Sequence, residues 1–128
     1  TESTLDLIIA GYEDEKTAEA FTLYEVGLSE PVNDFSTIGS GAAYAELFLR
    51  YLLPQERALE NVIKPVCYTI RLVGTIDPFV GGKINLVSVT EEDIQDISDR
   101  ASEFELEDAK ARKVLQSSIG RLSKLLKI

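Results

Sequence analysis

The stretch Phe35–Gly41, FSTIGSG, constrains the fold most strongly, because it joins two kinds of structure without a linker. Two glycines flank Ser40 and permit a sharp backbone turn, and the run Ala42–Leu53, rich in alanine and leucine, follows at once. This arrangement predicts a strand over Phe35–Ile38, a tight turn, and a helix whose free N–H groups are capped by the Ser40 hydroxyl.

The segments before this stretch have the patterns of strands. Leu5–Tyr12 is a short apolar run, and Glu13–Ala18 after it is a charged turn. Ala20–Gly27 alternates between two faces, so we expect it to return as the second strand of a hairpin. Leu28–Asp34 is predicted to be a loop, because Pro31 cannot occupy a central strand position.

Helical patterns dominate after the glycine turn. Pro54 ends the first helix, and Glu56–Thr75 is predicted to form a second helix with a kink or break at Pro65. A turn over Asp77–Lys83 and a strand over Ile84–Val89 follow. The predicted buried stripe of the second helix consists of Leu59, Val62, Ile63, Val66, Cys67 and Ile70.

The C-terminal part is expected to be helical as well. Thr90 resembles an N-cap, with Asp93 in the position of a capping box. Residues 105–128 form an amphipathic pattern, with six Lys or Arg against two acidic residues after position 106. We expect this helix to pack on its own domain rather than on a partner or a membrane surface. One face of it carries Ala111, Leu115, Ile119, Leu122 and Leu126.

Composition narrows the possible functions. The chain has 128 residues, enough for one domain, with a net charge of −9, which argues against nucleic acid as a partner. It has no histidine, which excludes Ser-His-Asp and Cys-His catalysis within the chain and most zinc sites. Cys67 is expected to be a buried, inert thiol.

We expect no cofactor, because neither glycine pair matches a phosphate-binding loop. We also expect no metal, because the acidic run does not have the spacing of a calcium loop and fits a solvated helix face. That run comprises Glu91, Glu92, Asp93, Asp96 and Asp99.

The order of strands followed by helices predicts an α+β fold with a sheet covered by helices. No apolar run is long enough to span a bilayer, and we expect a cytoplasmic protein. The chain has no methionine, so we expect it to be a processed product or an excised part of a longer protein.

Four segments, in this order, resemble the C-terminal half of proteasome core-particle subunits, which are N-terminal-nucleophile hydrolases. They are LIIAGYE, the hairpin return, TIGSGAAYAELFL and, after a long helix, DPFVGGKINLVSV; together they span roughly residues 5–95. Asp77 with Gly81 and Gly82 is similar to the D-x-x-S-G-G pattern of β-type subunits. The resemblance implies part of a four-layer α/β/β/α sandwich that lacks its first strands.

The resemblance also implies a role in protein degradation by a threonine-type peptidase. In that family the nucleophile is an N-terminal threonine, and Ser40 and Asp77 match residues that support its amine. Val80 stands where the family pattern has a second serine, and a valine cannot hydrogen-bond an amine. Helix capping by Ser40 and turn initiation by Asp77 would explain these two residues equally well without any catalytic role.

Thr1 is not assigned as the nucleophile, because the strand after it matches the family's middle strand and the nearest lysine is Lys16. We therefore expect an incomplete domain, inactive alone, that leaves sheet edges unpaired. The implied partners are the N-terminal half, other subunits of a ring or homo-oligomer, and peptide substrates. A non-catalytic structural or regulatory subunit is the alternative, and an unrelated α+β interaction module is a third.

Overall fold

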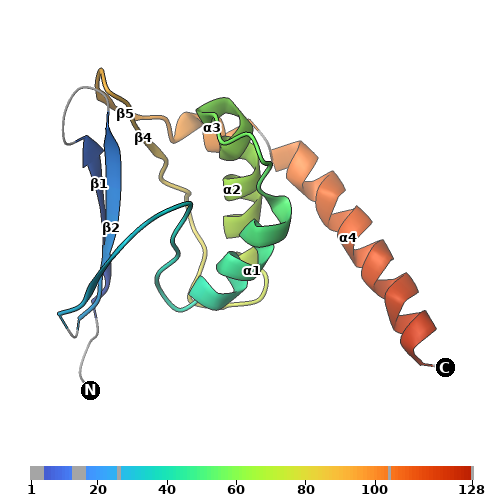
Figure 1. Ribbon diagram of the computed structural model, residues 1–128. Helices are drawn as coiled ribbons and strands as arrows, with labels where there is room; N and C mark the ends of the chain where they lie inside the picture. Colours follow the sequence, from blue (N-terminus) through green and yellow to red (C-terminus); the bar gives the residue numbers. More distant parts are fainter. Residues whose placement is uncertain (1–4, 13–16, 26, 104, 128) are drawn as a thin grey trace.

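The computed structural model describes residues 5–12, 17–25, 27–103 and 105–127, which form two small antiparallel sheets and four helices (Figure 1). This is an α+β fold, as predicted. In chain order the elements are β1 (Leu7–Tyr12), β2 (Ala18–Leu23), β3 (Ser29–Pro31), α1 (Ala42–Leu52), α2 (Leu59–Gly74), β4 (Val87–Val89), β5 (Ile94–Asp96), α3 (Asp99–Ser102) and α4 (Glu105–Leu126).

The predicted N-terminal hairpin is confirmed. β1 and β2 pair antiparallel from Leu7 opposite Leu23 to Tyr12 opposite Ala18. The charged turn expected between them lies largely outside the described residues.

Two predictions that follow the hairpin are wrong. Part of the expected loop forms β3, where Pro31 is tolerated because β3 is an edge strand of the β1-β2-β3 sheet. Residues Phe35–Ile38 are not a strand, because no described strand supplies ladder hydrogen bonds to them. A side-chain hydrogen bond connects this segment to the sheet instead, with the hydroxyl oxygens of Ser36 and Thr22 2.7 Å apart.

The β1–β3 sheet has one inner and one outer face. Thr22 is buried on the inner face, toward Ser36. Successive residues of a strand alternate between faces, so Leu7, Ile9 and Phe21 lie on the outer face, where they are exposed. This sheet therefore presents an uncovered apolar surface.

α1 and α2 form a pair and supply most of the buried residues. α1 ends at Leu52, just before Pro54, as predicted. α2 continues without a break through Pro65, contrary to prediction, because a proline in the second turn removes only one of the helix's hydrogen bonds. The buried stripe is also rotated from the predicted one: Leu59 and Ile70 are exposed. The buried residues of α2 are Ile63, Cys67, Tyr68, Thr69, Leu72 and Val73.

Thr90 does not cap a helix. The N–H of Asp93 donates to its hydroxyl at 3.3 Å and its own N–H donates to the Asp93 carbonyl at 3.0 Å, but the two residues close a β-turn between β4 and β5. A capping box shares only the first of these bonds, because there the side chain of the residue three places on, and not its main-chain carbonyl, accepts the N-cap N–H. The β-branched Ile94 after them continues as a strand. The predicted strand Ile84–Val89 is shorter, with β4 restricted to Val87–Val89.

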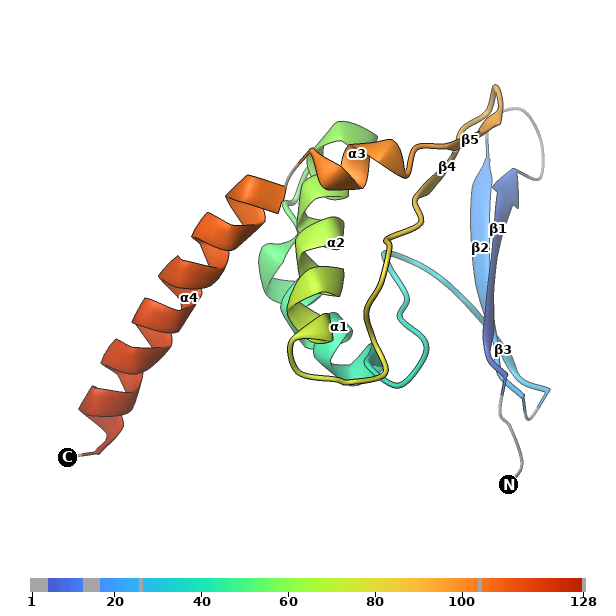
Figure 2. The same cartoon turned by 180° about the vertical axis from the view of Figure 1, so that it is seen from behind.

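The best-buried cluster lies between α2, α3 and the β4 segment. Ile63, Cys67 and Ala101 form its centre, and Ile84, Leu86 and Ile97 pack around them. Glu60 on α2 accepts two bonds of 2.8 Å from the Arg100 guanidinium, which fastens α3 to the start of α2. Figure 2 shows the β4 segment running between the β1–β3 sheet and α2.

α4 is the long C-terminal helix predicted for residues 105–128, but it packs on its own domain only near its start, where Arg112 and Leu115 are half-buried. It projects away from the other helices (Figures 1 and 2). Only its first turns approach α2, so its apolar residues Ile119, Leu122 and Leu126 remain exposed.

Candidate functional site

The two glycine-containing turns singled out in the sequence meet in the structure. Gly41 is buried, and a Cβ atom on it would lie 2.5 Å from Cγ1 of Val73, 3.0 Å from Cγ2 of Val80 and 3.7 Å from Oδ2 of Asp77. Only glycine fits there without displacing its neighbours. The turn before α1 and the turn after α2 therefore form one site.

The first turn depends on its glycines rather than on its serine. Gly39 has a φ of +101°, which L-residues rarely adopt. Its carbonyl accepts the N–H of Ala42 at 3.1 Å, and the Gly41 carbonyl accepts that of Ala45 at 3.0 Å, which starts α1. The N-cap is Gly41 and no side chain caps the helix, so the predicted capping role of Ser40 is wrong. Ser40 is exposed, and its hydroxyl is not used to hold the helix together.

Asp77 initiates the second turn, as its structural explanation predicted. Its carboxylate is only 8% exposed, and Oδ1 accepts the N–H of Phe79 at 2.8 Å. Its own N–H donates to the Val73 carbonyl at 2.8 Å, so the turn begins directly at the end of α2. This geometry leaves Oδ2 on the side of Gly41.

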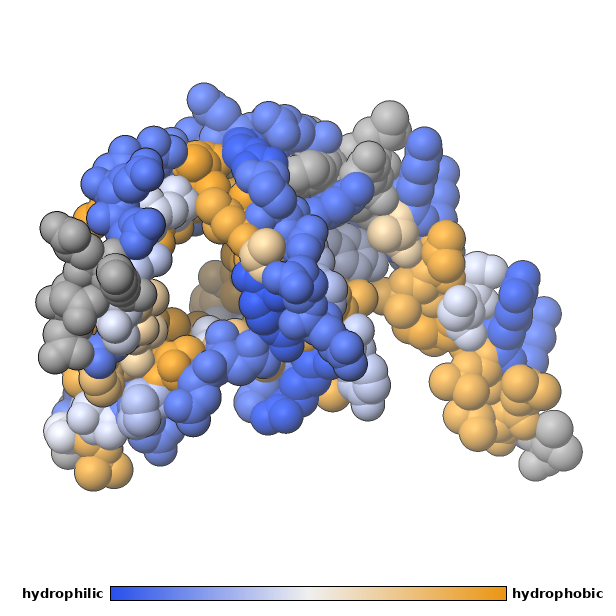
Figure 3. Space-filling view, turned by 45° about the horizontal axis from the view of Figure 1, so that its top comes forward, coloured by the Kyte–Doolittle hydropathy of each residue, from blue (hydrophilic) through white to orange (hydrophobic). Residues whose placement is uncertain are grey.

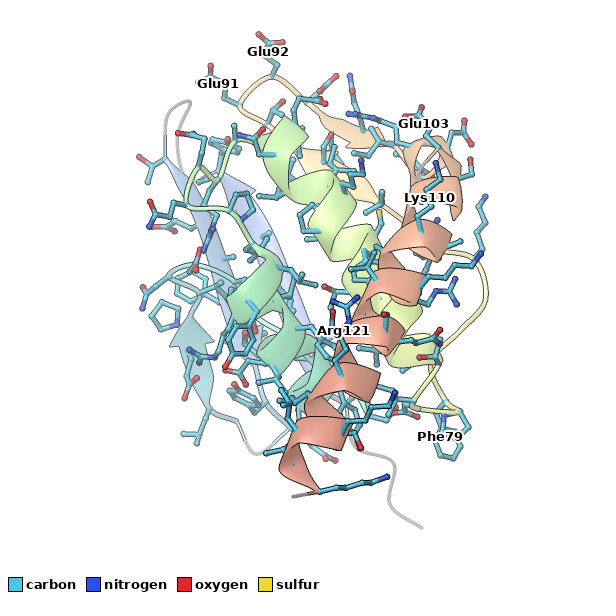
Figure 4. The ribbon with its side chains drawn as sticks, turned by 90° about the vertical axis from the view of Figure 1, so that its right-hand side faces the viewer. Phe79, Glu91, Glu92, Glu103, Lys110 and Arg121 are labelled. Carbon is cyan, nitrogen blue, oxygen red and sulfur yellow. The ribbon has the colours of Figure 1, made fainter. Side chains whose placement is uncertain are left out.

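A cavity of about 370 Å³ lies between the turns. Its lining is mostly apolar, with Ser40 as the one polar side chain among the lining residues, and Val80 lies against Gly41. Phe79, at 88% exposure, projects from the second turn (Figure 4). The cavity is lined by Ile38, Gly39, Ser40, Gly41, Ala42, Ala45, Ile70, Val73, Phe79 and Val80.

This site can bind a polar group but cannot activate its own nucleophile. The Ser40 hydroxyl and the Asp77 carboxylate can hydrogen-bond an amine, whereas no histidine exists to deprotonate Ser40. Val73 and Phe79 are members that the sequence analysis missed. Val73 could have been found from its spacing, because it lies one helical turn before Asp77.

Two further predicted sites have clear structural settings. Cys67 is fully buried, as predicted; burial raises the pKa of its thiol, and the charges of Arg71 and Arg100 oppose that rise. The acidic run does not lie on a helix face. Glu91 and Glu92 form the exposed tip of the β4–β5 hairpin (Figure 4), and no acidic, histidine or cysteine cluster suited to a metal occurs in the described part of the chain. Thr1 and Lys16 lie outside the described residues.

The chain matches no protein-family model, and no curated protein matches it. Among the described residues, no helix has both the length and the apolar character needed to cross a membrane.

Proposed function

We propose that this chain is the C-terminal half of a β-type, proteasome-like subunit and acts in protein degradation as part of a threonine-peptidase assembly. One observation carries the proposal: the GSG turn and the DPFVGG turn, far apart in sequence, pack together at Gly41. In this family these two turns flank the amine end of the nucleophilic threonine.

The proposed role of this half is to support the catalytic amine and to provide scaffold. Ser40 is exposed and does not cap the helix, so its hydroxyl is available to an amine placed between the turns, and Oδ2 of the buried Asp77 lies beside Gly41. A buried or half-buried carboxylate favours a nearby ammonium group. The threonine and its lysine would come from the N-terminal half.

The outer face of the β1–β3 sheet supports the finer fold that we propose, a four-layer α/β/β/α sandwich. Leu7, Ile9 and Phe21 form an exposed apolar surface of the kind that a stacked second sheet covers. The proposed assembly is a cytoplasmic ring or homo-oligomer that takes peptide substrates.

A non-catalytic structural or regulatory subunit is the second candidate, and Val80 favours it. Its side chain packs against Gly41 at the position of the family's second serine, so the amine would lose one hydrogen-bond partner.

The test measures the hydrolysis of a fluorogenic peptide by the protein, purified together with any sequence that precedes Thr1 in the full-length protein. Asp77→Asn keeps an acceptor for the Phe79 N–H but removes the charge, and Ser40→Ala removes only an exposed hydroxyl. The peptidase proposal predicts loss of turnover in both variants, while Asp96→Asn, at an exposed carboxylate in β5, keeps it. Assembled rings without turnover would instead indicate the non-catalytic subunit, and an inactive monomer would indicate an unrelated interaction module.

A further inference from the structure

α4 and the α1–α2 pair enclose an apolar groove of about 580 Å³. Tyr68 and Leu72 of α2, both buried, form its floor. One wall belongs to α1, where Leu47 is 51% and Tyr51 82% exposed. α4 supplies the other wall, where Val114 is 67% exposed. Large apolar side chains on both walls thus remain in contact with water.

A basic stripe runs along α4 beside this groove. Four cations, Lys110, Lys113, Arg121 and Lys124, are all exposed. At about 100° per residue they fall within an arc of about 80°, adjacent to the groove-lining face of the helix. Figure 4 shows Lys110 and Arg121 on the same side of α4.

From residue 109 onward, the charge that α4 brings to the groove is positive. Residues 109–127 contain six Lys or Arg and no Asp or Glu. The α1 wall adds no net charge, because Arg50 pairs with Glu46 at 2.8 Å. A ligand of the groove must offer apolar side chains to its floor and negative charge to the α4 stripe.

We propose that this groove binds an amphipathic α-helix of a partner protein whose apolar face is flanked by acidic residues. Helix-in-groove recognition uses such an apolar strip, and the flanking charges set the specificity. Figure 3 shows α4 standing apart from the body, with hydrophobic residues along it. This proposal does not depend on the proposed peptidase family.

Two other occupants fit less well. A bilayer is flat, whereas the apolar residues of α4 that line the groove face inward across it, toward α1 and α2. A second copy that exchanged α4 would bring two basic stripes together, and like charges at an interface oppose association.

The experiment uses a fluorescein-labelled peptide of about 18 residues, roughly 27 Å long as a helix, with leucines at helical spacing and glutamates on both flanks. A matched peptide replaces every glutamate with lysine. Fluorescence anisotropy at low salt should give at least about tenfold tighter binding for the acidic peptide, and this preference should shrink in about 0.5 M salt. Hydrogen exchange should show new protection in α1 and α4.

Three variants locate the binding site. Arg121→Glu should weaken the acidic peptide about tenfold. Lys127→Glu makes the same charge change just beyond the end of α4, away from the groove-lining residues 111–118, and should leave binding intact. Leu47→Asp should weaken both peptides, and circular dichroism checks that each variant remains folded.

Four results would overturn the proposal. They are equal binding of the two peptides, absence of binding, the same effect of Arg121→Glu and Lys127→Glu, and binding to phosphatidylserine vesicles without binding to the peptide. Sedimentation supplies one more: a dimer that Leu47→Asp dissociates would assign the groove to a second copy.

Discussion

Replacing Gly41 with alanine should destabilise the protein by a steric clash and not by backbone strain. The φ of Gly41 is −90°, which alanine adopts freely, so restriction of the unfolded chain alone would favour alanine by about 0.4–1 kcal/mol. The new methyl group, however, would lie 2.5 Å from Cγ1 of Val73, whereas carbon atoms pack best at about 3.5–4.0 Å. Val73 is buried and has a stiff, β-branched side chain, so it cannot turn aside.

Overpacking of this kind costs about 1–3 kcal/mol, so that, after the unfolded-state gain is subtracted, Gly41→Ala has a net loss of up to about 2.6 kcal/mol. Urea unfolding followed by helical circular dichroism measures it. Gly81→Ala is the matched control, because nothing lies within 4 Å of the Cβ atom that it would add and its φ is not left-handed.

Val73→Ala removes the atom that the new methyl group meets. In that background Gly41→Ala should therefore cost at least about 1 kcal/mol less, and a double-mutant cycle gives this difference directly. The reasoning is refuted if Gly41→Ala is as mild as Gly81→Ala, or if its cost is the same with and without Val73.

Three further predictions follow from single side chains. The Thr69 hydroxyl is buried without a partner among the described residues. Thr69→Val should therefore raise the free energy of unfolding, measured by urea titration, by about 1 kcal/mol, whereas Thr69→Ser should not raise it. Hydrogen bonds from Arg100 lower the pKa of Glu60, so the ion pair stabilises the fold above the ordinary glutamate pKa, and this contribution is lost as pH falls through the lowered pKa. The difference in unfolding free energy between wild type and Glu60→Gln should therefore vanish in acid. A constant difference across pH would contradict the ion-pair explanation. Cys67 should react with a thiol reagent only on unfolding, because the buried thiol is inaccessible and its pKa is raised; rapid labelling of the folded protein would disprove this.

The helices could be predicted from the sequence because their signals are local. The apolar spacing of α1 and the stop at Pro54 are contained within single segments. The contact between the glycine turns could not be predicted in this way, since no local pattern shows that Gly41 lies against Val80.

The failures share a cause, which is that tertiary partners decide among equivalent local patterns. The bond from the Asp93 N–H to the Thr90 hydroxyl occurs in a capping box as well as in this hairpin loop, and the pairing of β5 with β4 selects the loop. Residues 35–38 have the composition of a strand but no neighbour among the described strands to pair with. In α2, Tyr68 is buried where periodicity favoured Ile70, because Tyr68 lies beside α1 and α4.

The β1–β3 sheet is joined to the helices mainly by polar contacts, and Figure 3 shows an opening between the two parts. The Thr22–Ser36 hydroxyl pair is one such contact, and the bidentate bond from Arg57 to Asp34, at 2.8 and 2.9 Å, is another. Two isolated polar contacts confer little cooperativity, so we expect the hairpin to open while the helix pair stays intact. The amides of β2 should then exchange with solvent deuterium by sub-global opening, well before those of α2, and the molecule behaves as two cooperative units.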